Sequence, residues 1–213
     1  MRIYNIKKGA LGALKGNWGF AIGLFIISQI IINIVPQLLS YSVKPESSLF
    51  VLSSVIIVAY SLFIMPINSG YNWVFLDLIR GKRGKISDLF MPFSNHYWTV
   101  FATMILQSIF VFLWSLLFVI PGIIKGLAYS QSMFILKDHP EFTANKVITE
   151  SRKLMDGYKW KFFLLQLSFI GWGILSILTL GIGLLWLVPY ITAANAQFYE
   201  KLIENDKPDN LLD

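Results

Sequence analysis

Polar side chains interrupt the long apolar runs of this chain at positions where a site inside a membrane could form. Lys125 is the single basic residue between two apolar runs, and an unpaired charge in hydrocarbon costs about 3 kcal/mol. Its long side chain either reaches the outer membrane interface or lines a polar cavity together with amide side chains. The candidate intramembrane polar site comprises Asn68, Lys125, Gln131 and Asn195.

Basic residues beside the apolar runs form a second candidate site. Each Lys or Arg near an anionic membrane surface contributes about 1 kcal/mol of attraction. Four of these residues fall in RGKRGK at 80–85, which lacks the pattern of a nucleic-acid reader, and the others belong to a segment with helically spaced apolar residues. We predict contacts with anionic lipid headgroups, and no nucleic-acid binding, at Arg80, Lys82, Arg83, Lys85, Lys146, Arg152, Lys153, Lys159 and Lys161.

The motifs of common enzymes are missing from the sequence. It contains no H-E-x-x-H, no G-x-S-x-G and no Walker glycine loop, and it has no cysteine. The two histidines, His96 and His139, belong to separate segments, so a zinc site would require carboxylates gathered by the fold. We predict a protein that is not an enzyme, with no catalytic residues, no metal site and no cofactor.

Composition places these residues in a membrane protein. Hydrophobic residues make up 55% of the chain and charged residues 14%, whereas a soluble domain has about 25% charged residues. The uncharged run from Phe162 to Tyr199 would extend about 57 Å as one helix, roughly twice the hydrocarbon core of a bilayer. Two spans joined by a turn at Gly181 and Gly183 fit that length better.

The same reasoning applied to the other runs predicts an all-α polytopic membrane protein of about six spans, arranged as three αα-hairpins with amphipathic interfacial helices. Pro66 predicts a bend between residues 64 and 69. Residues 123–136 are short for a span, so this segment is either tilted, prolonged past Asp138 or re-entrant. The single membrane domain, 1–213, divides into an interfacial helix (1–15), hairpins (18–79, 97–138 and 161–203), a cytoplasmic amphipathic segment (139–160) and a polar tail (204–213).

The distribution of basic residues predicts the orientation in the membrane. With six spans and an inside N-terminus, 16 of the 18 Lys and Arg residues lie on the cytoplasmic side, and only Lys44 and Lys125 lie outside or at the outer boundary. Such a bias is typical of cytoplasmic loops. We therefore predict a multi-pass protein of the cell membrane with both termini in the cytoplasm.

The three hairpins share features that suggest a parallel repeat. A Trp precedes each first span, in KGNWGF (15–20), SNHYWTVF (94–101) and GYKWKFF (157–163), and a proline accompanies each return span. The spacings between Trp and proline differ, so chance resemblance among apolar helices is the alternative. The glycine pairs Gly19 with Gly23 and Gly122 with Gly126 suit close helix contacts, either within one protomer or between protomers.

Three segments of the C-terminal half carry a family resemblance: FVIPGIIKGLAYSQSMFILKD (118–138), SRKLMDGYKWKFFLLQLSFIGWGIL (151–175) and LTLGIGLLWLVPYITAANAQFYEKL (178–202). Together they resemble a family of integral membrane proteins of unknown function from Gram-positive bacteria. The resemblance implies a bacterial polytopic membrane protein and supplies no catalytic residues. The hairpin layout also resembles the membrane domains attached to some glycerophosphodiesterases, but no hydrolase domain accompanies it here.

Two functions from different classes remain open on the sequence alone. The favoured one is a non-enzymatic membrane module that binds anionic lipid headgroups on the cytoplasmic face, a membrane-protein partner or a second copy of itself, in an accessory, maintenance or immunity role in the bacterial envelope. The alternative is a small transporter or channel for an amphiphilic solute. A cavity lined by the intramembrane polar residues favours the alternative, and a closed core with a basic belt favours the module.

Overall fold

The computed structural model describes residues 1–41, 49–94 and 96–206, and these residues form helices and turns with no strand among them. The prediction of an all-α fold is confirmed. The helices are α1 (Ile3–Leu14), α2 (Trp18–Gln29), the π-helix η1 (Ile30–Ile34), α3 (Val35–Tyr41), α4 (Phe50–Ile64), α5 (Ile67–Ile79), the 3₁₀-helix η2 (Ile86–Phe93), α6 (Tyr97–Leu117), α7 (Val119–Tyr129), α8 (Ser132–Asp138), α9 (Ala144–Leu154), α10 (Lys159–Leu167), α11 (Ile170–Leu178) and α12 (Leu184–Asp206).

Within the described ranges, five helical stretches are long and apolar enough to cross a membrane: Trp18–Leu38, Phe50–Ile79, Tyr97–Leu117, Val119–Asp138 and Lys159–Leu178. The fourth stretch, α7 followed by α8, begins earlier than expected and reaches a full 20 residues at Asp138. The predicted sixth span falls on α12, whose second half carries Asn195, Glu200 and Lys201 and is therefore less apolar. Lys44 and residues 207–213 of the predicted polar tail lie outside the described residues.

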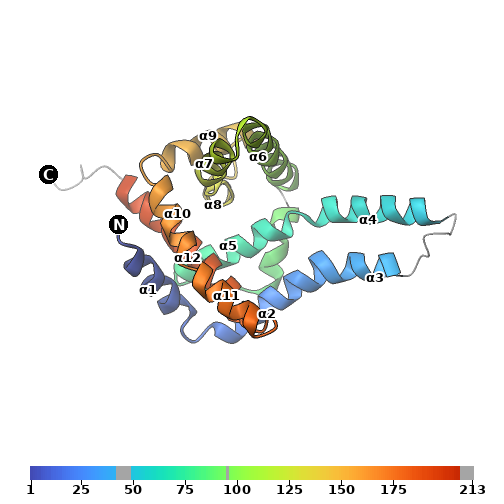
Figure 1. Cartoon of the computed structure of the whole chain (residues 1–213), viewed down its shortest axis with the longest axis horizontal. Coiled ribbons are helices and arrows are strands. Elements are labelled where there is room, and N and C mark those ends of the chain that lie inside the picture. The colour runs from blue at the N-terminus through green and yellow to red at the C-terminus, as the bar shows by residue number, and fades with distance from the viewer. Residues whose placement is uncertain (42–48, 95, 207–213) are drawn as a thin grey trace.

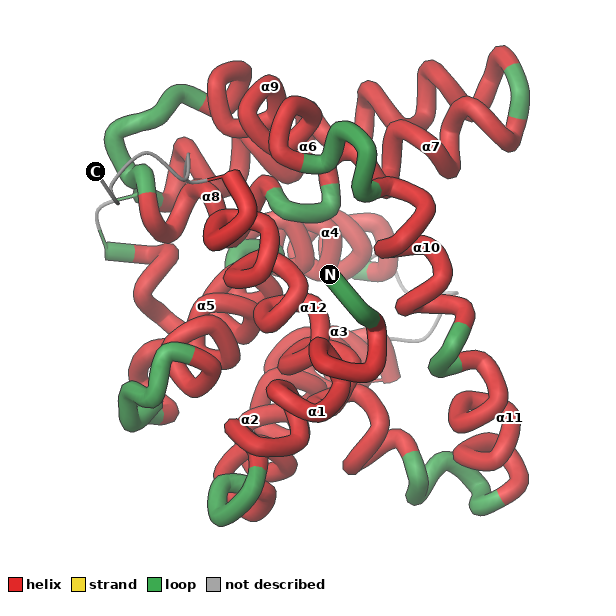
Figure 2. Tube along the Cα trace, turned by 90° about the vertical axis from the view of Figure 1, so that its left-hand side faces the viewer, coloured by secondary structure: helices red, strands yellow, loops and turns green. Residues whose placement is uncertain are grey.

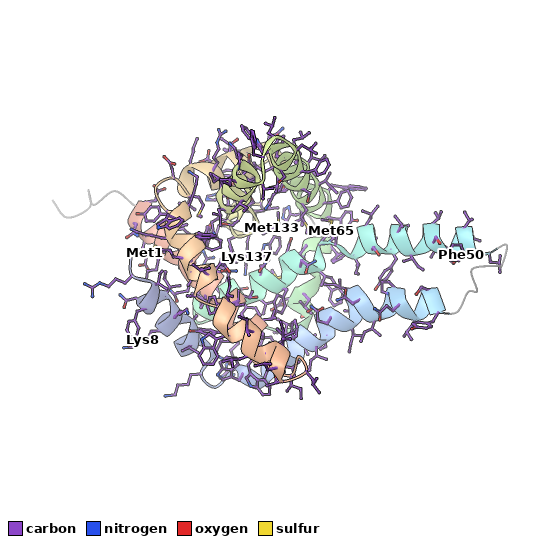
Figure 3. All side chains as sticks on the ribbon, in the orientation of Figure 1. Met1, Lys8, Phe50, Met65, Met133 and Lys137 are labelled. Atoms are coloured by element: carbon purple, nitrogen blue, oxygen red, sulfur yellow. The ribbon has the colours of Figure 1, made fainter. Side chains whose placement is uncertain are left out.

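Proline divides the second stretch at the predicted place. Because proline has no backbone N–H to donate, α4 ends at Ile64 and α5 begins at Ile67. Pro66 is the N-cap residue of α5. The two halves differ in their surroundings: none of the α4 residues is buried, whereas nine residues of α5 are. Figure 1 shows α3 and α4 projecting together from the rest of the molecule, and Phe50 lies at the far end of α4 (Figure 3).

The core forms around α12, which packs against α1, α2, α5 and α11. In Figure 2, α1 and α12 lie side by side. We predicted an interfacial helix at residues 1–15, and α1 turns Ile6, Ala10 and Leu14 into this core, where at most 1% of each residue is exposed. The helical spacing of these three residues correctly indicated one apolar face of α1. Other helices of the protein cover this face.

Close approaches of helices depend on two glycines. At Gly70 of α5, a Cβ atom would lie 2.0 Å from the backbone oxygen of Leu89 in η2. At Gly122 of α7, it would lie 2.0 Å from Oγ of Ser115 in α6. The latter contact agrees with the prediction of a small-residue contact within one protomer, whereas Cβ atoms at Gly19, Gly23 and Gly126 would meet nothing within 4 Å.

The three predicted entry tryptophans all stand at helix starts. Trp18 is the first residue of α2, Trp98 the second of α6 and Trp160 the second of α10. The prolines are less alike, because Pro121 lies near the start of α7 while Pro189 lies inside α12. The repeat of three hairpins stays a prediction.

Candidate functional site

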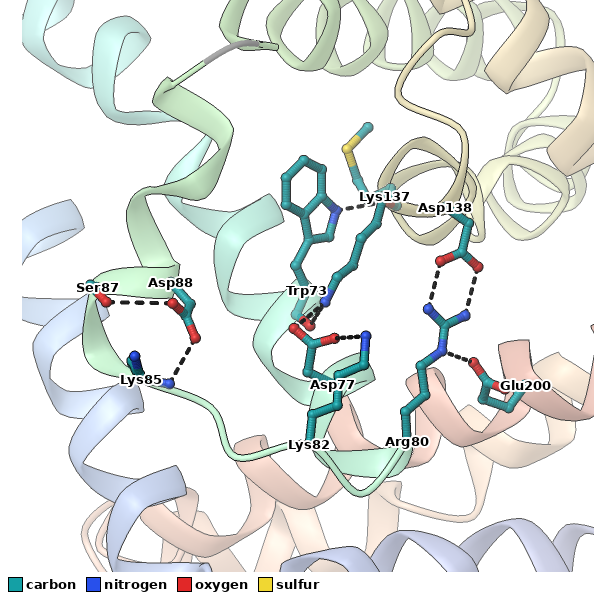
Figure 4. Close-up of polar contacts among 11 residues, drawn as sticks. Trp73, Asp77, Arg80, Lys82, Lys85, Ser87, Asp88, Lys137, Asp138 and Glu200 are labelled. Atoms are coloured by element: carbon teal, nitrogen blue, oxygen red, sulfur yellow. Dashed lines mark hydrogen bonds and ion pairs between the residues drawn. The ribbon is translucent and has the colours of Figure 1, made fainter.

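Charged side chains at the C-terminal ends of α5, α8 and α12 form a cluster that ties the three predicted hairpins together (Figure 4). Arg80 donates two hydrogen bonds of 2.6 Å to the carboxylate of Asp138, and its Nε atom donates a third of 2.6 Å to Glu200. The hydroxyl of Tyr199 donates to Asp138 at 2.9 Å. The hydrogen bonds to Asp138 raise the pKa of Arg80 above its usual value, so the guanidinium stays charged.

A second set of contacts extends this ion-pair cluster along α5. Lys137 of α8 lies 2.6 Å from the carboxylate of Asp77 and donates a hydrogen bond to the carbonyl of Trp73. The indole nitrogen of Trp73 in turn donates to the carbonyl of Met133 at 2.7 Å. Lys82 lies 3.6 Å from Asp77 and is largely exposed.

The composition of the cluster indicates a structural role. It contains the cations Arg80, Lys82 and Lys137 and an equal number of carboxylates, Asp77, Asp138 and Glu200. A balanced set of this kind offers no excess charge to an anion. Arg80, which we expected to contact lipid headgroups, is therefore held by the protein itself.

A hollow with an excess of positive charge lies where α7 meets α9 and the turn before α10. It has a volume of about 380 Å³ and is lined by Ile124, Lys125, Ala128, Arg152, Lys153, Asp156 and Lys159. Asp156 accepts a hydrogen bond of 2.7 Å from Lys159, which holds the pKa of Asp156 below its usual value. Lys153 pairs with Glu150 at 2.9 Å. Four basic side chains therefore line this basic hollow with one carboxylate, Asp156, and Glu150 is not among its lining residues.

Packing of α9 explains why these residues meet. Val147, Ile148 and Ser151 are buried, and α9 contacts α6, α7 and α8. The hydroxyl of Ser151 donates a hydrogen bond of 2.9 Å to the carbonyl of Ala128 in α7. The opposite face of α9 is polar, and Lys146, Arg152 and Lys153 are exposed there. The apolar residues of this segment therefore face the bundle, which is one of the two orientations that its periodicity allowed.

Lys125 occupies a position that sequence reasoning did not foresee. We expected it either at the outer interface or in a polar cavity with the predicted amides, yet it shares the hollow with Arg152, Lys153 and Lys159. The reason is that α9 lies against α7 instead of remaining at the end of the bundle. Its ammonium group lies 4.4 Å from the centre of the Trp114 ring, a distance suited to a cation–π contact.

The other members of the predicted intramembrane site lie apart from Lys125. Asn68 is exposed and its amide donates a 3.5 Å hydrogen bond to the carbonyl of Met65. Gln131 is fully buried, and its amide nitrogen donates to the hydroxyl of Ser130 at 2.8 Å. Asn195 of α12 accepts a hydrogen bond of 2.6 Å from Gln166 of α10. The four residues thus do not form one site.

The remaining predicted lipid contacts lie mostly on the surface. Arg83, Lys85, Lys146 and Lys161 are exposed, and Lys146 and Lys161 lie over the rings of Phe142 and Tyr158, at 3.8 Å and 5.2 Å. None of these four side chains forms an ion pair with another described residue. They stay available to headgroups, in contrast to Arg80.

Sequence reasoning missed the pairing of Arg80 with Asp138 and Glu200. A signal for it exists, because Arg80 and Asp138 each stand directly at the end of an apolar stretch and carry opposite charges. Residues at the same membrane depth can pair when their helices meet. The contribution of Glu200 has no such signal, since it depends on where α12 packs.

Comparisons with known proteins address only the C-terminal part of the chain. No curated protein and no solved structure matched. Residues 116–206, which run from the end of α6 through α12 and include the basic hollow, match the family described as Protein of unknown function (DUF975).

Proposed function

We propose that this chain is a non-enzymatic, multi-pass protein of the bacterial cell membrane that binds anionic lipid headgroups at its cytoplasmic face, as an accessory or maintenance component of the envelope. The observation that carries the proposal is the basic hollow. Lys125 and Arg152 have no carboxylate partner among the described residues, so the hollow keeps the charge that a phosphate group would neutralise.

The surroundings of the hollow suit a lipid better than a free anion. Ile123 and Ile124, which precede Lys125 on α7, are about half exposed, at 50% and 46%. Trp160, beside Lys159, is 67% exposed, and exposed tryptophans are enriched at membrane interfaces. A headgroup in the hollow would leave its acyl chains along the apolar surface of α7. A volume of about 380 Å³ falls within the range of small-molecule sites.

The orientation is part of the same proposal. The basic residues concentrate in the segments predicted to lie inside, which supports the proposal that both termini are cytoplasmic and that the exposed face of α9 meets the inner leaflet. The inner leaflet is the side on which anionic lipids attract basic residues most strongly. The proposal therefore assigns Lys125, which the count from the sequence put at the outer boundary, to the inner side together with Arg152 and Lys153.

Reversing two charges of the hollow tests this proposal. Arg152→Glu/Lys153→Glu removes two attractive residues, each worth about 1 kcal/mol, and adds two repulsive ones, so the dissociation constant for phosphatidylglycerol should rise at least tenfold. We would measure it by native mass spectrometry of the detergent-solubilised protein, with phosphatidylcholine as the neutral lipid. The difference should shrink as salt is added.

Lys8→Glu/Lys15→Glu provides the matched control. It changes the net charge by the same amount at two exposed positions away from the hollow, and it should raise the dissociation constant by less than threefold. Equal losses in both double variants would show that lipid binding depends on total charge alone. Equal binding of phosphatidylglycerol and phosphatidylcholine by the wild type would overturn the proposal.

A further inference from the structure

A second cavity, of about 850 Å³ and called the central cavity below, is lined by residues of α5, α6, α7, α8, α10 and α12 and is open at the exposed residues Ser108, Phe112 and Ser115. All three predicted hairpins contribute to its walls. It shares no lining residue with the basic hollow. Figure 3 shows Met65 and Met133, two of its lining residues, towards the middle of the molecule.

The polar groups of this central cavity are all uncharged. Its polar lining residues are amides and hydroxyls, and no Asp, Glu, Lys or Arg is among the residues that line it. A ligand that carried a charge into the cavity would leave water without gaining an ionic partner, which is strongly unfavourable. The part of a ligand that enters must therefore be uncharged.

Several of the amides have hydrogen-bonding capacity to spare. Gln166 donates to Asn195 at 2.6 Å, which leaves the amide nitrogen of Asn195 and the carbonyl oxygen of Gln166 open to another partner. Gln107, at the middle of α6, and Asn72 of α5 have no side-chain hydrogen bond to another described residue. Polar groups without partners at membrane depth are costly, so these amides favour a ligand with hydroxyl groups.

The remaining lining suits a hydrocarbon chain that enters from the bilayer. Met65, Met104 and Met133 provide flexible apolar side chains that adapt to irregular shapes. Phe112 lines the cavity and is also 62% exposed on the surface of α6, so the cavity opens towards the lipid-facing side of this span.

We propose that the central cavity binds an uncharged lipid through a hydroxyl-bearing headgroup, of which diacylglycerol is the simplest example. The amides of Gln107, Gln166 and Asn195 hydrogen-bond the hydroxyl and ester oxygens, and the chains leave past Phe112 into the bilayer. This ligand differs from the anionic lipid of the basic hollow.

Binding of dioctanoylglycerol to the purified full-length protein, measured by native mass spectrometry, tests the inference. Trioctanoylglycerol, in which a third octanoyl ester replaces the free hydroxyl, should bind at least fivefold more weakly. Gln107→Met keeps the size of the side chain but removes its amide, and it should weaken dioctanoylglycerol binding at least fivefold. Gln29→Met is the matched control, because Gln29 lies in a span but pairs with Asn33 away from the cavity.

A second variant fills the space itself. A Cβ atom on Gly126, which lines the cavity from α7, would meet nothing within 4 Å, so the side chain of Gly126→Leu should extend into the cavity and reduce binding at least tenfold. Gly23→Leu, in similarly open space on α2, should leave binding unchanged. Equal binding of the two glycerides, or unchanged binding by Gly126→Leu, would overturn the inference.

The charge reversal in the basic hollow separates this inference from the proposed function. Arg152→Glu/Lys153→Glu should leave dioctanoylglycerol binding unchanged while it weakens phosphatidylglycerol binding. If the reversal weakens both lipids to the same degree, the uncharged lipid occupies the basic hollow and the assignment of the central cavity is wrong.

Discussion

Arg80→Gln should lower the free energy of unfolding by about 3 kcal/mol, because it removes the cation shared by Asp138 and Glu200. Breaking a buried ion pair from one side costs about 3–5 kcal/mol, and we expect the lower end because the three side chains are 19% to 25% exposed. Reversible unfolding in mixed micelles measures this change. Lys82→Gln is the control: Lys82 is 66% exposed, and its loss should cost less than about 1 kcal/mol.

A triple variant separates the ion-pair effect from a simple loss of packing. Arg80→Gln combined with Asp138→Asn and Glu200→Gln removes both carboxylates that the first substitution leaves unpaired. It should recover at least half of the lost stability, since apolar or neutral replacements of a whole buried network are far less costly than removal of one member. A single-variant loss below 1 kcal/mol would contradict the structural role of the cluster.

Gly70→Ala should destabilise the protein by about 3 kcal/mol or more. The added methyl group would lie 2.0 Å from the backbone oxygen of Leu89, so α5 and η2 would have to separate. Overpacking costs typically about 1–3 kcal/mol, and a backbone neighbour yields less readily than a side chain. The same unfolding measurement applies.

Gly12→Ala in α1 is the matched substitution. No atom lies within 4 Å of its added Cβ, so the change should stabilise the protein by up to about 1 kcal/mol through helix propensity. If Gly70→Ala is as stable as the wild type, the close contact between α5 and η2 does not exist.

The helices themselves could be predicted from the sequence, and physical reasons explain why. Bilayer thickness limits the length of each span, and Pro66 and the turn at Gly181 each mark a place where a long apolar stretch is interrupted. Gly181 has a positive φ of 86°, as the turn requires. These signals are local in the sequence, so they can be recognised without knowing which helices pack against each other.

The partners of the helices could not be predicted in the same way. Periodicity indicated an apolar face on α1 and on α9, but a face of this kind fits a lipid surface and a protein surface equally well. In both cases much of that face is covered by other helices. For the same reason Lys125, whose depth was inferred from its place in the chain, was expected away from the basic residues that it joins.

The position of α12 had the largest consequences for the candidate sites. It supplies Glu200 and Tyr199 to the ion-pair cluster and Asn195 to the central cavity. Its apolar first half suggested an ordinary span. The sequence alone does not indicate whether the polar residues of its second half line a cavity or belong to a solvated helix end. Only the packing of α12 against the other helices resolves these roles.

Labelling of single cysteines in cells tests the orientation, on which the proposed function depends. The chain has no cysteine, so each introduced cysteine reports one position. Asn145→Cys at the exposed start of α9 should react with a membrane-impermeant maleimide only after the cells are permeabilised, whereas Leu180→Cys, at a residue that is 95% exposed in the turn before α12, should react in intact cells. Labelling of Asn145→Cys in intact cells would contradict the proposal that the exposed basic face of α9 lies on the cytoplasmic side.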